Sequence, residues 1–220
     1  MTEPVPFASG RDADVFLLDA GTVLRRYRAG GDVAGEAAMM AHVAGYGYPV
    51  PRVVSAGGPD LVMERLDGPT LLGALAALAV TPAAGAELLA DLHRRLHEIP
   101  ARSSTGPADR VLHLDLHPDN VMLTTRGPVV IDWRNAVDGP PDFDVALSAL
   151  ILAEVAVDPA GPYAAPAREM LVAFLGAAGG RPLDLLPRAV AMRAGNPTLS
   201  AAEKASLDGA AALVRAAAAG

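Results

Sequence analysis

HLDLHPDN, residues 113–120, is the stretch that decides the fold, and it stands directly before the apolar run VMLTT. His and Asp alternate at positions 113, 115, 117 and 119, and Asn120 closes the stretch. A metal-binding strand, a catalytic loop and a polar turn without chemistry all fit eight residues of this kind. The remainder of the chain has to decide among the three.

The first interpretation is a metal-binding strand. Side chains alternate along a strand, so His113, Asp115 and His117 would share one face and offer a transition metal such as zinc two imidazoles and a carboxylate. Pro118 interrupts such a strand, and no further histidine follows in the chain to complete a closed site. A metal-dependent hydrolase with these three ligands is therefore one alternative, and stoichiometric zinc in the purified protein would support it.

The catalytic-loop interpretation is supported by residues elsewhere in the chain. The spacing H-x-D-L-x-x-x-N is typical of kinase catalytic loops, in which the Asp accepts the substrate hydroxyl proton and the Asn holds magnesium. Asp115 and Asn120 fit this spacing, and Asp132 ends an apolar run, VVID, 17 residues after Asp115. A carboxylate at the end of a buried strand is a hard oxygen ligand of the kind that Mg²⁺ prefers.

These motifs resemble those of the aminoglycoside phosphotransferase and choline kinase-like family, which has the protein-kinase fold. HLDLHPDN is similar to the family's H-G-D-x-H-x-x-N loop, and Ile131-Asp132-Trp133 is similar to its I-D-W/F element. Residues 139–144, GPPDFD, resemble the start of the helix whose Asp braces the catalytic loop. The resemblance covers nearly the whole chain, and its motifs follow one another in the family's order.

The resemblance implies a role for each matching residue. Asp115 would be the catalytic base, and Asn120 with Asp132 would hold Mg²⁺. In the N-terminal part, a helical Glu would pair with a basic residue on the third strand, hinge residues would meet the purine, and a loop would lie over the phosphates. The residues implied at the nucleotide, ATP or GTP, are Arg25, Glu36, Met63, Glu64, Leu66 and Gly10.

Three departures from the family pattern stand out. Arg25 occupies the place of the usual phosphate-binding Lys, since the single Lys of the chain is Lys204. Arg stays charged and can reach both Glu36 and phosphate oxygens, but it is longer and forked. Leu114 stands where the family usually has Gly, and the phosphate loop holds one Gly. Arg25 and Leu114 motivate the main alternative, a nucleotide-binding pseudokinase that acts as a regulatory module without transfer activity.

Hydrophobic periodicity predicts an α+β chain with two lobes. The first part combines β-rich runs with one helix that Asp32 would cap, and after Leu66-Asp67-Gly68 helical periods dominate. Together with the family resemblance, this pattern implies a two-lobed, protein-kinase-like fold, with a nucleotide-binding N-lobe at 1–66 and a C-lobe at 67–220 that carries the catalytic loop, the metal site and the acceptor-binding helices. The strands are expected at 15–18, 22–27, 53–54, 61–63 and around 121–131, and the helices at 70–78, 84–98, 142–155, 163–178, 182–194 and 200–218.

Composition limits the partners and the compartment. The net charge of −7 offers no basic footprint for nucleic acid. No purely apolar run of 18 residues predicts a membrane span, and the N-terminus does not read as a signal peptide. The chain has no Cys, which fits a cytoplasmic protein. We expect a monomer or a homodimer.

The function predicted from these observations is transfer of the γ-phosphate of ATP or GTP to a hydroxyl group of a small molecule. An aminoglycoside-like or other antibiotic, an amino alcohol, a sugar and a natural-product intermediate all suit it as acceptor. Few residues separate the hinge from the catalytic loop, so acceptor contacts are expected from the helices between 142 and 218. The candidate acceptor-binding residues are Asp142, Glu154, Arg193 and Asn196.

Overall fold

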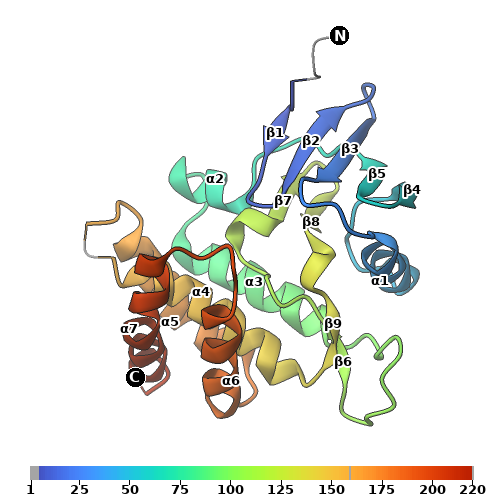
Figure 1. The fold of residues 1–220 in the computed structure, drawn as a ribbon. Coiled ribbons are helices and arrows are strands. Elements are labelled where there is room, and N and C mark those ends of the chain that lie inside the picture. The colour runs from blue at the N-terminus through green and yellow to red at the C-terminus, as the bar shows by residue number, and fades with distance from the viewer. Residues whose placement is uncertain (1–4, 159, 220) are drawn as a thin grey trace.

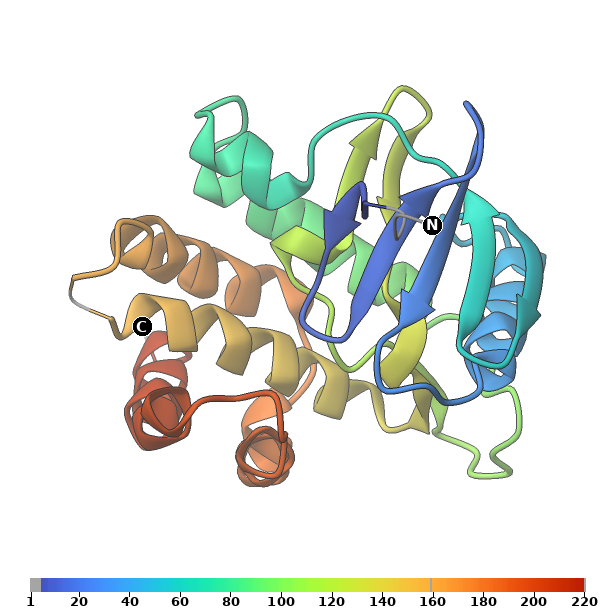
Figure 2. The same ribbon diagram turned by 45° about the horizontal axis from the view of Figure 1, so that its top comes forward.

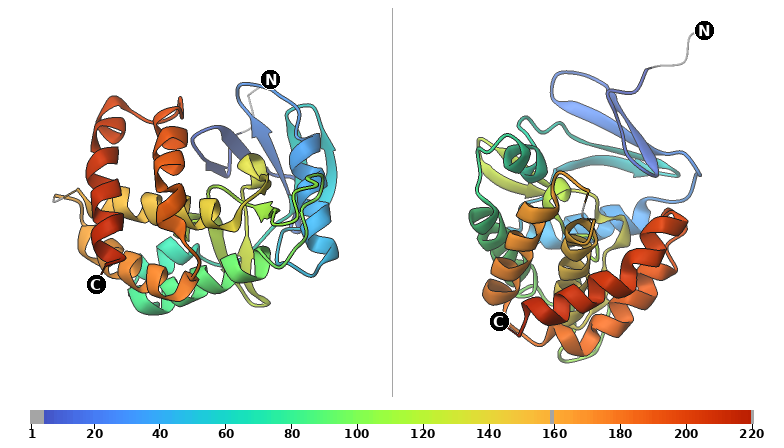
Figure 3. Two further views of the ribbon diagram at one scale, coloured as in Figure 1. Left: turned by 90° about the horizontal axis from the view of Figure 1, so that it is seen from below. Right: turned by 90° about the vertical axis from the view of Figure 1, so that its left-hand side faces the viewer.

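The first third of the chain forms a five-stranded antiparallel sheet with one helix beside it (Figure 1). The computed structural model describes residues 5–158 and 160–219. In spatial order the strands are β1 (Ala8–Ser9), β2 (Ala13–Leu17), β3 (Thr22–Tyr27), β5 (Asp60–Glu64) and β4 (Val53–Gly57). Helix α1 (Ala34–Gly45) contacts β4 and runs beside the sheet, as Figure 3 shows.

The predicted hairpin between β2 and β3 is confirmed, and one carboxylate closes its turn. Asp19 accepts hydrogen bonds from the Gly21 backbone N–H and from the Thr22 hydroxyl, both at 2.7 Å. Pairing in the ladder sets Val15 opposite Arg25 and Phe16 opposite Leu24. Because side chains alternate along a strand, this register fixes the face on which Arg25 lies.

Helix α1 forms where the sequence predicts it, but its start differs from the expectation. Met39, Met40 and Val43 are buried at helical spacing, together with Glu36. The N-cap residue is Val33 and not Asp32, so the predicted cap is wrong by one position. Asp32 instead accepts a hydrogen bond from the Ala34 backbone N–H at 2.9 Å, so it still satisfies one free donor of the first turn.

The remaining chain is mostly helical and surrounds one buried helix, α4 (Pro141–Ala156). Helices α5, α6 and α7 pack against α4, and α3 packs against α5 (Figures 2 and 3). Apart from α4, the helices are α2 (Leu71–Ala76), α3 (Pro82–Leu96), α5 (Ala164–Ala178), α6 (Pro182–Ala194) and α7 (Ala201–Ala217), which agree with the predicted ranges. No helix within the described residues combines the length and hydropathy needed to cross a bilayer.

Two short antiparallel strand pairs flank the predicted catalytic residues. Strands β7 (Val121–Thr124) and β8 (Gly127–Val130) form the hairpin predicted around 121–131. Strands β6 (Arg110–Leu112) and β9 (Val137–Gly139) pair with each other and were not predicted. Between these two ladders lie both the HLDLHPDN loop and residues 131–136, so the two motifs are brought side by side.

Candidate active site

The catalytic loop is fixed by hydrogen bonds to a buried carboxylate at the start of α4. Asp144 has no exposed surface, and its two oxygens accept hydrogen bonds from the backbone N–H groups of His113 at 3.0 Å and Leu114 at 2.7 Å. His97 contributes a third contact, with Nε2 3.0 Å from Asp144 Oδ2. Because these bonds go to main-chain groups, they fix the loop backbone directly before Asp115.

His113 ties the same loop to the strand that leads to Asp132. Its Nδ1 accepts from the Asp115 backbone N–H at 3.3 Å, and its Nε2 lies 3.0 Å from the carbonyl oxygen of Ile131. The carbonyl can only accept, so Nε2 carries the proton. Both ring nitrogens are therefore engaged, and the loop is not a strand. The metal-binding strand is thus contradicted, because His113 has no lone pair left for a metal.

Leu114 adopts a backbone conformation that is unusual for its type. Its φ is 61°, in the left-handed region, and its side chain is buried. Only Gly occupies this region without a steric cost, which explains physically why a Gly suits this position of the loop. The two backbone hydrogen bonds that Asp144 accepts and the burial of the leucine side chain oppose that cost.

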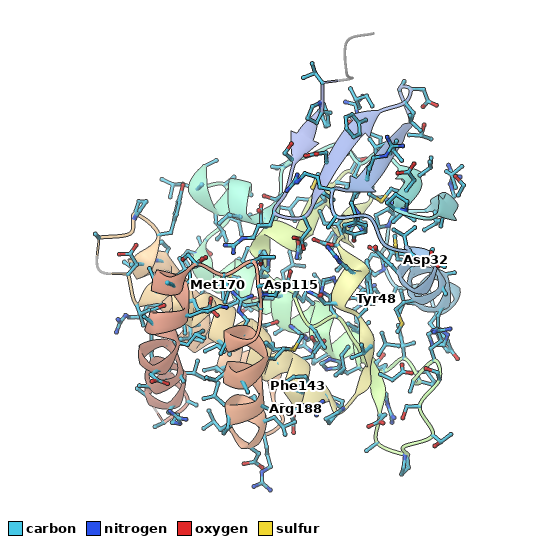
Figure 4. All side chains as sticks on the ribbon, viewed as in Figure 1. Asp32, Tyr48, Asp115, Phe143, Met170 and Arg188 are labelled. Atoms are coloured by element: carbon cyan, nitrogen blue, oxygen red, sulfur yellow. The ribbon has the colours of Figure 1, made fainter. Side chains whose placement is uncertain are left out.

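Asp115 and Asn120 come together as the spacing predicts, and Figure 4 shows Asp115 between the sheet and the helices. The amide nitrogen of Asn120 donates to the Asp115 carbonyl at 2.9 Å and lies 3.3 Å from Asp115 Oδ2. That arrangement turns the amide oxygen of Asn120 away, and no described residue donates to it. The Asp115 carboxylate keeps about a quarter of its surface exposed, so a reactant can reach it.

Asp132 lies at the turn that follows β8, in the left-handed region with φ 64° and ψ 66°. The Ile131 backbone N–H donates to the Asn120 carbonyl at 3.0 Å. Asp132 is the next residue after Ile131, so this bond brings it close to the end of the catalytic loop. Its carboxylate is half exposed. Asp132 and the free amide oxygen of Asn120 are hard oxygen donors that suit Mg²⁺, which takes few protein ligands and keeps several waters.

Arg25 is the centre of a charged group that joins both motifs to the sheet. Its guanidinium is ion-paired with Glu36 of α1, donates to the Tyr27 hydroxyl at 2.7 Å and reaches Asp132 at 3.0 Å. The Tyr27 hydroxyl donates in turn to Glu36 at 2.8 Å. Burial alone would lower the pKa of Arg25, but the charges of Glu36 and Asp132 raise it. Arg26 lies on the opposite face and pairs with Asp60 at 2.6 Å.

Tyr27 and Arg134 were missed by the sequence reasoning. Tyr27 lies two residues after Arg25, on the same face of β3, and that spacing is the signal that would have found it. Arg134 follows the Ile131-Asp132-Trp133 motif, stacks 4.3 Å from the Tyr27 ring centroid and pairs with Asp12 at 2.9 Å. No pattern in the sequence links Arg134 to Asp12, because the pair joins residues 122 positions apart.

The loop around Gly10 reaches across to the helical part of the chain. Gly10 closes it with a backbone hydrogen bond to Ala13 at 2.9 Å, and Arg28 donates to the Gly10 carbonyl at 2.8 Å. Arg11 then pairs with Glu203 of α7 at 2.8 Å. The loop is thus connected to the C-terminal helices by Arg11 and to residues 133–135 by Asp12.

The predicted hinge residues lie where β5 ends. Glu64 donates its backbone N–H to the Arg52 carbonyl at 2.9 Å, and its carboxylate pairs with Arg126 at 2.9 Å. Met63 faces Val23 and Val53 in neighbouring strands. Within the described part of the chain, the backbone N–H of Leu66 has no hydrogen-bond partner.

Two of the four candidate acceptor residues lie near the catalytic loop. Arg193 of α6 and Glu154 of α4 form a two-fold ion pair at 2.7 and 2.8 Å, with both side chains largely buried. Burial alone would lower the pKa of Arg193, but Glu154 and, further away, Asp115 raise it. Asp142 instead accepts from the Arg181 backbone N–H at 3.0 Å, and Asn196 accepts from the Thr198 backbone N–H at 2.9 Å.

Comparison with known proteins bears on the family and the fold of the chain. The model of the phosphotransferase enzyme family matches residues 3–110 and 104–183, which is most of the chain. A search of curated proteins found no match. Many solved structures match, and those described below are examples.

Three solved structures illustrate the likeness. A ternary complex of the aminoglycoside phosphotransferase APH(4)-Ia, a thermostable mutant, with AMP-PNP and hygromycin B is 16% identical, with a TM-score of 0.66 over 100% of this chain and 95% of the other. Amicoumacin kinase hAmiN, in complex with AMP-PNP, Ca²⁺ and Ami, is 14% identical, with a TM-score of 0.61 over 98% and 89%. A choline/ethanolamine kinase family protein from Mesorhizobium loti is 18% identical, with a TM-score of 0.57 over 95% and 86%.

At these identities the structures show the fold, and the family model shows the family. The predicted α+β, two-lobed, protein-kinase-like fold is confirmed. The family resemblance carried by HLDLHPDN and Ile131-Asp132-Trp133 is confirmed as well. The chain therefore belongs to the phosphotransferase enzyme family.

Proposed function

We propose that this protein transfers the γ-phosphate of ATP or GTP to a hydroxyl group of a small molecule, with Mg²⁺ bound by Asn120 and Asp132. The observation that carries the proposal is a set of contacts among the predicted residues. Asn120 contacts the accessible Asp115 carboxylate, and the Arg25 guanidinium is paired with Asp132. Solved structures of similar fold contain the nucleotide analogue AMP-PNP, which supports a nucleoside triphosphate as donor.

The reaction follows from the position of each side chain. The acceptor oxygen attacks the γ-phosphorus, the bond to the β–γ bridging oxygen breaks, and the hydroxyl proton passes to Asp115. Arg25 keeps one part of its guanidinium on Glu36 and turns the other toward the β-phosphate, where negative charge develops on the leaving nucleoside diphosphate. Bound Mg²⁺ would supply further neutralisation of the phosphate oxygens.

The nucleotide would lie between the sheet and the catalytic loop. The Leu66 N–H, which has no partner in the described part of the chain, and the Glu64 carbonyl would meet the edge of the purine, with Met63 beside it. The loop at Gly10 would cover the phosphates, since Asp12 already connects it to Arg134 and Arg11 connects it to Glu203 of α7. We place the boundary between the N-lobe and the C-lobe at residues 66 and 67, just after β5 ends at Glu64.

The acceptor is proposed to bind on the side of Asp115 that faces Arg193 and Glu154. Solved relatives of this fold are described in complex with gentamicin, hygromycin B and Ami, and another is a choline/ethanolamine kinase family protein. An antibiotic or a metabolite with a free hydroxyl is therefore the class to test first. Glu154 is already paired with Arg193, so the charge available to a cationic acceptor there is small.

A transfer assay tests the proposal. The purified protein is incubated with γ-³²P-labelled ATP or GTP, with and without Mg²⁺, and with panels of aminoglycosides, amino alcohols and sugars. We expect Mg²⁺-dependent labelling of an acceptor, or slow release of phosphate to water. Binding of nucleotide in a thermal-shift assay, with neither transfer nor hydrolysis under any condition, would contradict the proposal and favour a regulatory pseudokinase.

A further inference from the structure

Helices α3 and α4 face each other through two polar pairs beneath the catalytic loop. His93 and His97 lie one turn apart on α3, and Asp144 and Ser148 lie one turn apart on α4. His93, Asp144 and Ser148 are buried, and the His97 side chain is 11% exposed. The pair His97–Asp144 holds the loop backbone before Asp115. The pair His93–Ser148 has no part in the site described so far.

The His93–Ser148 pair ends on the loop backbone after Asp115. The hydroxyl oxygen of Ser148 lies 2.6 Å from the Leu116 carbonyl oxygen, and His93 Nε2 lies 2.8 Å from the same hydroxyl. A carbonyl can only accept, so the Ser148 proton points to Leu116, and the hydroxyl oxygen must then accept from His93. The result is a directed chain of two hydrogen bonds from His93 through Ser148 to Leu116.

The protonation of His93 agrees with this direction. Burial lowers the pKa of His93, against the opposing effect of Asp144, so the ring carries one proton at neutral pH. That proton lies on Nε2, where Ser148 accepts it. Nδ1 has no hydrogen-bond partner and lies 3.5 Å from Asp144 Oδ2. The hydrogen bond of His93 therefore goes to Ser148, and Asp144 is its charged neighbour.

The hydroxyl of Ser148 has an unusual partner for its place in a helix. A mid-helix Ser commonly bonds to the carbonyl one turn earlier in its own helix. Ala would fit the same space and is the better helix former. The Ser148 hydroxyl instead donates to the catalytic loop. The same loop holds Leu114 at a positive φ, a conformation that persists only when the surrounding structure fixes it.

We infer that His93 and Ser148 are positioning residues that fix the catalytic loop on the C-terminal side of Asp115, as Asp144 fixes it on the N-terminal side. This inference rests on the proposed phosphoryl transfer by Asp115. Held at His113, Leu114 and Leu116, the loop keeps the Asp115 carboxylate at hydrogen-bond distance from the acceptor hydroxyl. Neither His93 nor Ser148 touches a reactant.

The test compares variants at position 148 by two readouts. In the full-length protein, Ser148→Ala removes the hydroxyl, and Ser148→Thr retains it. We expect Ser148→Ala to lower kcat for nucleotide hydrolysis or transfer by about 10-fold to 100-fold, with an unchanged KM for the nucleotide, because misplacing a catalytic group costs rate and not donor binding. We also expect faster amide hydrogen exchange in the segment 110–120. Ser148→Thr should recover most of both properties.

A double-variant cycle examines the direction of the chain. His93→Leu should lower kcat less than Ser148→Ala does, and it should have no further effect in the Ser148→Ala background, because His93 acts through Ser148. The matched control is Ser206→Ala. Its hydroxyl bonds to the Glu203 carbonyl inside α7, so its loss should leave kcat and exchange at 110–120 unchanged.

The outcomes separate this inference from the proposed function. Unchanged kcat per folded molecule and unchanged exchange at 110–120 in Ser148→Ala would overturn the inference, even if the variant is less stable. Additive effects of His93→Leu and Ser148→Ala would overturn the relay. If the wild-type protein neither hydrolyses nor transfers phosphate, the proposed function fails, and the exchange measurement still decides whether Ser148 holds the loop.

Discussion

At the scale of single residues, the site is built from side chains that serve the backbone as much as the chemistry. Asp144, His113 and Asn120 all spend hydrogen-bonding atoms on main-chain groups of the loop. Asp115, the proposed base, is left accessible between them. The sequence predicted Asp115, Asn120 and Asp132 from spacing, and it marked Leu114 as unusual, but it held no information on the φ angle that makes Leu114 unusual.

Because Leu114 has a positive φ, we predict that glycine at this position gives a more stable protein than alanine, the reverse of their usual order. Leu114→Gly and Leu114→Ala both lose the buried side chain, but only glycine relieves the left-handed strain, which costs about 1–2 kcal/mol. We therefore expect the Gly variant to be the more stable of the two by about 1 kcal/mol. Urea unfolding of both variants measures the difference. An Ala variant more stable than the Gly variant would contradict the assigned backbone conformation.

Arg25 predicts a second residue-scale result. Arg25→Met should remove nucleotide binding and destabilise the fold by about 3–5 kcal/mol, because the buried Glu36 would lose its partner. Arg25→Lys should retain most nucleotide affinity but lose the Tyr27 contact, because an ammonium cannot fork. Arg26→Met is the matched control. Its exposed pair with Asp60 should contribute less than about 1 kcal/mol. Calorimetric titration and urea unfolding distinguish the three variants.

At the scale of elements, α4 and the helices packed against it determine where the catalytic loop lies. A long periodic segment such as α3 was predicted from sequence because its apolar spacing is local information. Strands β6 and β9 were not predicted, since each has three residues and forms only by pairing with the other. The one-residue error at Asp32 has the same origin, because cap geometry depends on the direction in which the chain enters the helix.

The buried groups between α3 and α4 predict acid sensitivity. Burial lowers the folded-state pKa of His93 below 6.5, so the unfolded chain binds a proton first, and stability falls as the pH drops below that value. Burial would raise the pKa of Asp144, but His93 and His97 hold it well below 3.8, so further stability is lost below that pH. His97, Asp144 and His113 are the titratable groups that act on His93.

Thermal unfolding between pH 8 and pH 3 measures this dependence. The wild-type Tm should be level above pH 7, fall in the range below 6.5 and fall again below 3.8. His93→Leu should weaken the first decline without removing it, because burial also lowers the pKa of His117. A His93→Leu variant whose Tm follows the wild-type curve throughout would show that His93 does not cause the decline.

Glu203 predicts how the phosphate loop is connected to α7. Backbone hydrogen bonds at Ser200, together with Arg11, lower the pKa of Glu203 to about 2. Glu203→Gln keeps the capping partner at this position but loses the charge that binds Arg11. We expect nearly unchanged Tm and faster amide exchange over residues 9–14. If exchange in that loop is unaltered, the Arg11–Glu203 pair does not restrain it.

At the scale of the whole molecule, the N-terminal part and the helical part are connected by contacts that no sequence pattern predicts. Arg11 and Glu203 are 192 positions apart, and Arg25 and Asp132 are 107 apart. Sequence motifs identify the chemistry of each part, because catalytic spacing is local. The way the parts meet depends on how the sheet packs over the helices, and only the structure provides that. Arg134 was missed for this reason, because it meets Asp12 only in the folded chain.

The decisive measurement is transfer of labelled γ-phosphate by the wild-type protein and by Asp115→Asn, each with Mg²⁺ and with EDTA. We expect Mg²⁺-dependent transfer to an acceptor, or to water, that falls by about 100-fold to 10,000-fold in Asp115→Asn, while nucleotide binding and Tm stay at wild-type values. Equal rates in the two proteins, or full activity in EDTA, would contradict the assignment of Asp115 as the base and of Asn120 and Asp132 as the metal ligands.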